Sequence, residues 1–187
     1  AWQLPVVFVV NNNQWAISVP RRIQCGAPTL AQKAIGAGFA GEQVDGNDVV
    51  AVYERFGQAL ERARHGKGPV LLECLSYRLG DHTTADDATR YRPAEEVKQA
   101  WQEEPIKRLQ AYLVAQGQWD ETREQALIAD CQAQLQAAVL AYEAIGQQPA
   151  ESAMDYVYAQ WPAALADQRE LLQARAARQL NGGRQHD

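Results

Sequence analysis

Residues 5–20 read Pro-Val-Val-Phe-Val-Val-Asn-Asn-Asn-Gln-Trp-Ala-Ile-Ser-Val-Pro, and this stretch decides the fold. An apolar run from Leu4 to Val10 ends abruptly at three asparagines. Continuous apolarity, rather than alternation, is typical of a strand buried on both faces of a parallel sheet. The asparagines are either a simple turn or amide ligands at the carboxyl end of the strand, where open parallel sheets bind their ligands. The residues alone leave both interpretations open.

The composition is that of an ordinary globular protein of one to one and a half domains, with 187 residues, 47% hydrophobic and 22% charged. A net charge of −5 argues against a nucleic-acid partner, because phosphate binding depends on clustered lysine and arginine. Cys25, Cys74 and Cys131 have no metal-ligand spacing and are odd in number, which favours a reducing, cytoplasmic location. No apolar stretch approaches the ~20 residues of a membrane span, so we expect no membrane partner.

The next residues predict alternating helices and strands. This order predicts right-handed parallel crossovers, and hence an α/β fold with a parallel sheet flanked by helices. Asn47 or Asp48 should cap an amphipathic helix, whose expected apolar face is Val49, Val52, Phe56, Leu60 and Ala63. The other expected elements are a loop over 21–27, a helix with Thr29 as N-cap and Gln32 completing a capping box, and strands over 42–44 and 69–75.

Residues 76–94 show neither a helical nor a strand period. A structureless segment this long is usually a functional loop or a disordered one. It leaves the carboxyl end of its strand, as the asparagines leave theirs, so we expect both segments at the same edge of the sheet. This convergence predicts a binding site there.

From Ala94 the chain becomes helical, so we expect domains over 1–93 and 94–187. Asp120 should cap a long helix with an apolar stripe that packs against a neighbouring helix or subunit; its members are Ile128, Cys131, Leu135, Ala138, Tyr142 and Ile145. The aromatic segment 154–162 should lie against its own domain or a partner. We expect residues 178–187 to fray.

Residues 12–20, Asn-Asn-Gln-Trp-Ala-Ile-Ser-Val-Pro, resemble the closing half of the thiamine diphosphate motif in α subunits of the E1 component of 2-oxo acid dehydrogenase complexes. Residues 77–92, which include Gly-Asp-His-Thr-Thr-Ala-Asp-Asp, resemble the active-site loop of the same subunits. The resemblance covers nearly the whole chain but only the C-terminal half of the family's subunit, and the Gly-Asp-Gly that opens the motif is absent. The chain is therefore either an excerpt or a naturally shortened gene product.

The resemblance implies a cofactor site. Asn13 would coordinate the Mg²⁺ that holds the diphosphate, Trp15 would add its main-chain carbonyl, and Ile17 would contact the cofactor. Mg²⁺ prefers near-octahedral oxygen ligands at about 2.0–2.1 Å and uses few protein ligands beside phosphate oxygens. Asn11 departs from the Gln, Arg or Glu often found at its position, so we expect no diphosphate contact from its side chain.

The resemblance also implies roles for the later loop. His82 would lie near the cofactor's thiazolium and act in proton transfer and acyl transfer, which suits an imidazole that titrates near neutrality. His65 and His186 are interpreted as ordinary histidines, either on the surface or hydrogen-bonded in the core. Thr83 occupies a position that carries a phosphorylated serine in animal relatives. The residues expected to order the loop through ion pairs are Arg78, Asp86, Asp87, Arg90 and Arg92.

The implied reaction is oxidative decarboxylation of a 2-oxo acid, with transfer of the acyl group to a lipoyl group on the E2 component. The implied partners are an E1 β subunit, the lipoyl-bearing E2 component and the substrate; pyruvate is favoured, then branched-chain 2-oxo acids, then acetoin. This chain should be inactive alone. A second hypothesis is a folded remnant without catalysis that acts as an interaction or assembly module. A third pairs two copies through an exposed sheet edge.

Overall fold

The computed structural model describes residues 2–146 and 148–182. It consists of two compact units that divide after Asp120. The first unit holds a parallel sheet flanked by helices, and further helices follow in the chain, which confirms the predicted fold class. The domain boundary expected after residue 93 stays a prediction.

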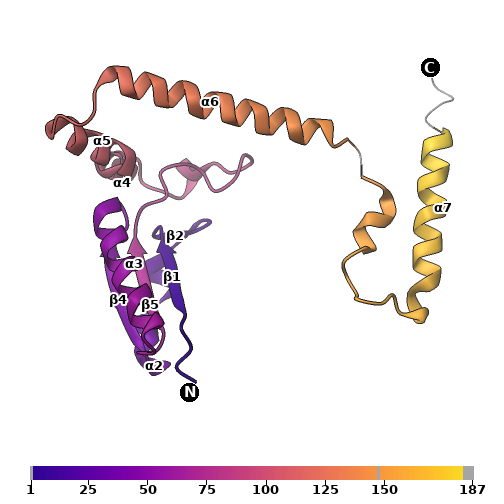
Figure 1. Ribbon diagram of the computed structural model, residues 1–187, viewed down its shortest axis with the longest axis horizontal. Helices are drawn as coiled ribbons and strands as arrows, with labels where there is room; N and C mark the ends of the chain where they lie inside the picture. The colour runs from indigo at the N-terminus through magenta and orange to yellow at the C-terminus, as the bar shows by residue number, and fades with distance from the viewer. Residues whose placement is uncertain (1, 147, 183–187) are drawn as a thin grey trace. The chain divides into compact units, whose positions relative to one another are not determined.

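The sheet has three parallel strands in the order β1-β5-β4 (Figure 1), formed by β1 (Val7–Asn12), β4 (Ala40–Asp45) and β5 (Val70–Leu75). A separate antiparallel hairpin follows β1 and pairs β2 (Trp15–Ala16) with β3 (Val19–Pro20). The strands predicted over 42–44 and 69–75 are confirmed, and the first is longer than expected. Because β5 lies between the other two strands, it occupies the centre of the sheet.

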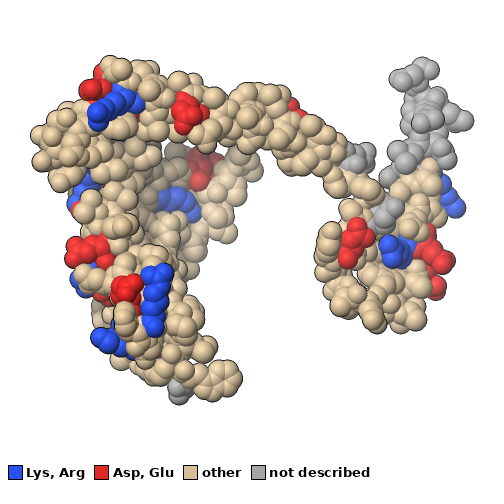
Figure 2. All heavy atoms as spheres, in the orientation of Figure 1, with Lys and Arg blue, Asp and Glu red and all other residues tan. Residues whose placement is uncertain are grey.

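Helix α3 (Val49–Arg64) covers one face of the sheet (Figure 1). Of the two residues predicted as its cap, Asn47 and Asp48, it is Asp48 that accepts hydrogen bonds from the N–H groups of Val50 and Ala51, each at 3.0 Å. The core of this face consists of Val44, Leu72 and Cys74 from the strands, with Ala51, Val52 and Phe56 packed from α3. Acidic and basic side chains are interspersed on the exposed surface of this region (Figure 2).

The opposite face carries the segment that leads into α2 (Lys33–Gly36), including the buried Ala31 and Ala34. The capping box predicted at Thr29 is wrong, because the helix begins only at Lys33 and has no side-chain cap. The N–H of Ala31 instead donates to the Glu73 carboxylate, which fixes this segment as a turn against the sheet. The loop expected over 21–27 is also partly wrong, since α1 (Arg21–Gln24) forms there while the Arg21 side chain donates to the carbonyls of Ala27 and Pro28.

Strand β1 is not buried on both faces, contrary to the expectation from its continuous apolar sequence. Phe8 is 48% exposed and Val9 is 53% exposed. The physical reason is position: among the described residues β1 has a strand neighbour, β5, on one side only. The apolar run therefore predicted a strand correctly but overestimated how far its side chains are buried.

The rest of the first unit is a long loop followed by short helices. The loop after β5 contains a 3₁₀ turn, η1 (Ala88–Arg90). After it come α4 (Ala94–Ala100), η2 (Trp101–Glu103) and α5 (Pro105–Ala115). The helices expected from Ala94 onward are confirmed.

The second unit contains α6 (Glu121–Ala144), η3 (Ala150–Met154), η4 (Ala163–Leu165) and α7 (Ala166–Gly182). The apolar stripe of α6 is exposed, with Leu135 at 67% and Tyr142 at 77%, so no described helix buries it; packing against another subunit stays a prediction. Because α7 continues to Gly182, the expected fraying is wrong for 178–182, and residues 183–187 lie outside the described part. None of the described helices is both long and apolar enough to cross a membrane.

Candidate functional site

The asparagine segment and the loop after β5 lie side by side, as predicted. The N–H of Ser76 donates to the carbonyl of Asn12 at 2.9 Å, and the N–H of Arg78 donates to the carbonyl of Asn13 at 3.2 Å. The Ser76 hydroxyl also donates to Oδ1 of Asn11 at 2.7 Å. These bonds extend the parallel register of β1 and β5 beyond the strands, so two polar segments from distant parts of the sequence meet at the carboxyl edge.

The asparagines form a tight turn stabilised by their own side chains. Oδ1 of Asn12 accepts from the N–H of Gln14 at 3.2 Å, and Oδ1 of Asn13 accepts from the N–H of Trp15 at 3.1 Å. Gln14 has a φ of 69°, in the left-handed region that non-glycine residues rarely adopt. The two side-chain bonds hold this unusual backbone, which is the kind of local arrangement found at functional sites.

The turn presents two neutral oxygens that suit a hard cation. Trp15 pairs with Pro20 across the β2–β3 hairpin, and proline has no N–H, so the Trp15 carbonyl receives no hydrogen bond from that neighbour. The Asn13 amide oxygen lies two residues earlier in the same turn. These two oxygens are of the kind that occupies positions in the coordination shell of Mg²⁺. Within the described residues no group of three or more His, Cys, Asp or Glu side chains could hold a metal ion.

Ile17, the third residue expected near a cofactor, ties the hairpin to the later loop. Its φ is 54°, and its carbonyl accepts a hydrogen bond from Nη2 of Arg78 at 2.7 Å. The Ile17 side chain is 54% exposed. The contact to Arg78 fixes the tip of the hairpin relative to the segment that follows β5.

Tyr91 connects the charged residues of the later loop. Nη2 of Arg78 donates to the Tyr91 hydroxyl at 3.0 Å, and that hydroxyl donates to Oδ2 of Asp86 at 2.5 Å. The same carboxylate oxygen accepts from the backbone N–H of His82 at 2.9 Å. The hydrogen bond from Tyr91 lowers the pKa of Asp86, and the same bond raises the pKa of Tyr91. Asp86 therefore stays ionised and holds the backbone of His82, whose side chain is exposed.

Arg92 orders the start of the loop through backbone carbonyls. It is 7% exposed and donates to the carbonyls of Arg78, Leu79 and Gly80. Its guanidinium lies over the Tyr77 ring, 5.7 Å from the centroid. These bonds give the two terminal nitrogens of a buried cation neutral acceptors, while its Nε has no hydrogen-bond partner among the described residues.

Asp87 and Arg90 make more local contributions. Asp87 caps η1 by accepting from the N–H and hydroxyl of Thr89, and the Arg90 side chain makes no hydrogen bond or ion pair within the described part of the chain. Among the described residues no direct ion pair joins the loop arginines to Asp86 or Asp87, and Arg78 reaches Asp86 only through the Tyr91 hydroxyl. The loop-ordering role of these five charged residues stays a prediction, as does catalysis by His82.

A cavity of about 900 Å³ opens at the carboxyl edge of the sheet. Its lining joins the asparagine turn to the ends of β4 and β5 and to α4; it includes Trp15, Asp45, Ser76, Tyr77, Tyr91 and Glu96. The Tyr77 hydroxyl donates to Glu96 at 2.9 Å, and burial together with this carboxylate raises the pKa of Tyr77. The cavity thus has aromatic walls and polar groups, which is typical of a small-molecule site.

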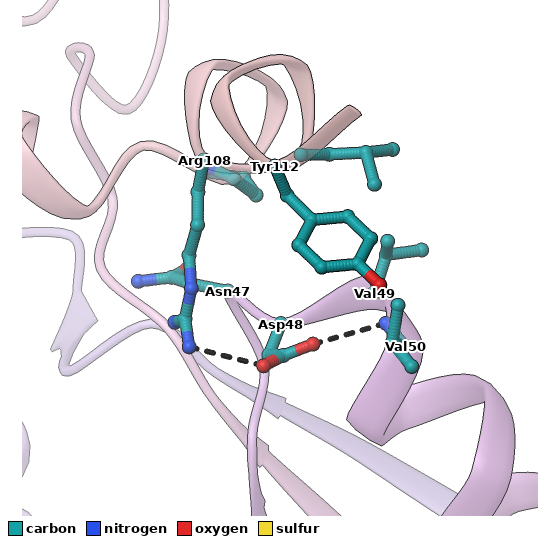
Figure 3. A pocket seen from close by; sticks show the side chains of 8 residues that line it. Asn47, Asp48, Val49, Val50, Arg108 and Tyr112 are labelled. Atoms are coloured by element: carbon teal, nitrogen blue, oxygen red, sulfur yellow. Dashed lines mark hydrogen bonds and ion pairs between the residues drawn. The ribbon is translucent and has the colours of Figure 1, made fainter. Parts of the chain in front are cut away.

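A smaller cavity of about 330 Å³ lies between the start of α3 and α5 (Figure 3). Arg108 spans it and donates to Asp45 at 2.6 Å and to Asp48 at 3.0 Å. Burial by itself would raise the pKa of Asp45, but the hydrogen bonds from Arg108 and from the N–H of Asn47 outweigh it and lower that pKa. The ion pairs of Arg108 with Asp45 and Asp48 therefore close one side of the cavity. They connect α5 to the end of β4 and to the start of α3.

Three residues of this region make contacts that the sequence did not predict. Glu73 is fully buried on β5, Asn12 is 6% exposed at the end of β1, and Tyr91 forms the connection described above. A glutamate in the middle of an otherwise apolar strand was the available signal for Glu73, since buried carboxylates need partners. No comparable signal marks Tyr91.

Residues 1–151 match the model of a protein family described as "Dehydrogenase E1 component". The chain belongs to this family. The E1 α-type resemblance that residues 12–20 and 77–92 carry is thereby confirmed at the level of the family.

Curated E1 relatives include the pyruvate dehydrogenase E1 component subunit alpha of Staphylococcus epidermidis, which is 42% identical over 172 residues. The protein of the same description from Staphylococcus aureus is 41% identical over the same length. Each alignment covers 91% of this chain and 46% of the relative. The chain therefore spans about half the length of the curated E1 relatives that it matches.

Proposed function

We propose that this chain supplies the diphosphate-and-metal side of a thiamine diphosphate site in an E1 component that decarboxylates a 2-oxo acid. The observation that supports this most directly is the pair of backbone hydrogen bonds that join Asn12 and Asn13 to Ser76 and Arg78. Because of these bonds, the segment that leads to His82 starts beside the asparagine turn. Membership of the E1 family favours this chemistry over other uses of a parallel-sheet edge.

In this proposal the Asn13 amide oxygen and the Trp15 carbonyl hold Mg²⁺, and Ile17 contacts the cofactor. His82 accepts or donates a proton at the reacting substrate, which suits an imidazole near neutral pH. Bound thiamine diphosphate would supply the carbanion-stabilising chemistry. Arg78 and Asp86 orient the loop through Tyr91, and Asp87, Arg90 and Arg92 complete the set that orders it.

The proposed reaction is oxidative decarboxylation with acyl transfer to a lipoyl group of an E2 component. Pyruvate is the favoured substrate because the curated relatives reported above are named for it, and branched-chain 2-oxo acids come next. An E1 β subunit is the proposed partner. The chain alone should be inactive, because in this proposal the E1 β subunit supplies the other half of the site, with the glutamate that activates the cofactor.

Calorimetric titration with thiamine diphosphate and Mg²⁺ tests the cofactor site in the 187-residue chain joined to the preceding half of a relative's subunit. Asn13→Ala should abolish binding, because it removes a metal ligand. Asn11→Ala is the matched control and should retain binding, since the Asn11 side chain accepts a hydrogen bond from Ser76 and is not a proposed ligand. Equal binding by the two variants would contradict the assignment of Asn13.

A reconstituted E1 tests His82. This chain would be joined to the preceding half of a relative's subunit and assembled with an E1 β subunit. His82→Ala should reduce transfer of the acyl group to a lipoyl domain by about 10²- to 10⁴-fold, the usual range for a lost general acid or base. His65→Ala, a substitution on the exposed end of α3, is the control and should leave the rate unchanged.

A non-catalytic interaction module remains the second candidate function, because the apolar stripe of α6 is exposed. Leu135, Tyr142 and Ile145 are each more than half exposed, which is a common feature of binding surfaces. The calorimetric titration separates the two candidates. Micromolar binding of thiamine diphosphate by the isolated chain would contradict the module; no binding even after the preceding half is added would contradict the enzyme.

A further inference from the structure

Glu73 is a charged residue at the centre of the sheet. It lies in the middle of β5, between β1 and β4, and its exposed fraction is 0%. An ionised carboxylate in such a place is costly unless several donors compensate for the lost water. Since no part of the proposed reaction uses Glu73, its presence needs another explanation.

Donors surround both oxygens of this carboxylate. Nδ2 of Asn12 donates to Oε1 at 2.6 Å, and the N–H of Ala31 donates to Oε2 at 2.9 Å. The Gln43 side chain and the N–H of Leu30 also contribute hydrogen bonds. Burial alone would raise the pKa of Glu73, but these donors outweigh burial and lower it. Position 73 therefore requires a side chain whose two oxygens both accept hydrogen bonds.

The Asn12 amide transmits this arrangement to the asparagine turn. Its nitrogen donates to Glu73, and its oxygen accepts from the N–H of Gln14 at 3.2 Å. A flipped amide would place donors against the Gln14 N–H and an oxygen against the carboxylate, so Glu73 fixes which way the amide points. The bond to Gln14 in turn holds the residue with positive φ. The carbonyl of Trp15 follows directly in the chain.

The hydrogen bond from the N–H of Ala31 to Glu73 depends on a close approach of two backbone segments. The segment before α2 passes directly over β4 at Gly41, where an added Cβ would lie 2.1 Å from the Ala31 carbonyl oxygen. Only a residue without a side chain permits this approach. It brings the N–H of Ala31 to the carboxylate, so Glu73 joins all three strands and the segment on their surface.

We propose that Glu73 is a positioning residue, which sets the Asn12 amide and thereby the turn that presents the Asn13 side chain and the Trp15 carbonyl. The metal part of this inference rests on the proposed function. The coupling from Glu73 through Asn12 to Gln14 does not, because it concerns hydrogen bonds within the chain itself.

The donors and acceptors define a matched pair of substitutions. Glu73→Gln replaces one acceptor with an NH₂ group, which then faces either Asn12 Nδ2 or the Ala31 N–H. Asn12→Asp places a second carboxylate against Glu73. The double variant Glu73→Gln with Asn12→Asp restores the pattern: the new amide donates to Asp at 12, and the remaining carboxylate oxygen still accepts from Gln14. The total charge is also that of the original chain.

Amide hydrogen exchange of the 187-residue chain, measured by NMR, tests the coupling without any ligand. Glu73→Gln should speed exchange at Gln14 and Trp15 by about tenfold relative to the amides of β5, the effect of losing one hydrogen bond of ~1.4 kcal/mol. The double variant should return both rates to within about threefold of the original. Glu42→Gln, on the exposed rim of β4, is the charge control and should change neither rate.

If Glu73→Gln unfolds the chain, exchange rises everywhere and the double variant decides the question. Recovery of the fold and of slow exchange at Gln14 supports the inference, because two independent defects would add rather than cancel. A double variant no better than the single ones overturns it. So does unchanged exchange at Gln14 and Trp15 in a folded Glu73→Gln chain.

Binding of Mn²⁺ in the presence of thiamine diphosphate, followed by the electron paramagnetic resonance signal of the free ion, tests the metal part. Glu73→Gln should weaken Mn²⁺ binding about tenfold, and the double variant should restore it. Unchanged affinity in Glu73→Gln overturns the metal part. If the chain binds no Mn²⁺ even when it is joined to the preceding half of a relative's subunit, the proposed function fails, while hydrogen exchange of the 187-residue chain still decides the role of Glu73.

Discussion

Strands β1 and β5 have similar apolar sequences but very different environments. Val9 on β1 and Leu72 on β5 are register partners, so they lie next to each other across the sheet. Leu72 is 1% exposed and Val9 is 53% exposed. Leu72 belongs to the core that α3 covers, while β1 forms one edge of the sheet. The comparison teaches that an apolar run predicts a strand without predicting its place in the sheet.

The two strands also differ in where their polar residues lie. On β1 the polar residues come at the end, where Asn11 and Asn12 lead into the turn. On β5 the polar residue Glu73 lies in the interior, in a place that an apolar residue would ordinarily occupy. The Asn12–Glu73 hydrogen bond joins these two positions. The central strand therefore both supports the core and holds the edge strand's turn.

The largest expected effect compares the register partners directly. Leu72→Ala should lower the free energy of unfolding by about 2–5 kcal/mol, because it leaves a cavity under α3. Val9→Ala should lower it by less than about 1 kcal/mol, since half of that side chain is already in water. Urea denaturation followed by circular dichroism measures both. Equal losses would mean that Val9 is covered in solution.

The buried carboxylate of β5 predicts a pH dependence. Because the pKa of Glu73 is lowered from its ordinary 4.5, its contribution to stability is fully present above that value and is lost as pH falls through the lower pKa of the folded chain. At about pH 7, Glu73→Gln should cost about 1–3 kcal/mol. The difference between the variant and the original chain should shrink in acid. A difference independent of pH in urea denaturation would contradict ionisation of Glu73.

Helix α3 packs on Leu72 and Cys74 of β5 and so contributes to their burial. A substitution that weakens the first turn of α3 should therefore lower the stability of the chain. Asp48→Ala removes the N-cap acceptor for Val50 and Ala51 and should cost about 1 kcal/mol. Asn47→Ala is the neighbouring control and should change stability by less than about 0.5 kcal/mol. Thermal unfolding of the three chains checks the order. A larger effect at Asn47 would place the cap there instead.

The smallest effect on stability is expected for a substitution on the edge strand β1. The same substitution should nevertheless change the association of chains. Val9→Lys should change the free energy of unfolding by about 0.5 kcal/mol or less and should reduce pairing of chains through β1, because a charge on an edge strand opposes it. Size-exclusion chromatography over a range of concentrations measures association. If the original chain elutes as a monomer throughout, β1 does not pair two copies. Leu72→Lys is the contrast and should prevent folding.

Much of the fold follows from local patterns in the sequence. The apolar spacing of 49–63 predicted α3, and Asn47 and Asp48 predicted its start because the side chain of either can accept from free N–H groups of the first turn. The same reasoning failed at Thr29. There the N–H of Ala31 bonds to Glu73, 42 residues away in the chain, and a tertiary bond of this kind leaves no local trace.

The site was predicted in its components but not in its connections. The residues of 12–20 and 77–92 identified the family, and the order of the strands predicted that these segments would meet. The ion pairs expected between Arg78 and the aspartates are replaced by a hydrogen-bonded path through Tyr91. Nothing in the spacing of Arg78, Asp86 and Tyr91 could predict that path, since it depends on how the loop folds back on itself.

The sequence by itself determined the parallel α/β fold, the family and the two segments that form the candidate site, because hydrophobic period, capping residues and short motifs are local properties of a chain. Only the tertiary structure decided that β1 is half exposed, that Glu73 holds the Asn12 amide and that Tyr91 joins Arg78 to Asp86. These features depend on which surfaces remain uncovered and which donors meet which acceptors after packing. The three asparagines are therefore visible from the sequence as the start of a candidate site, whereas the carboxylate that holds the Asn12 amide is visible only in the folded chain.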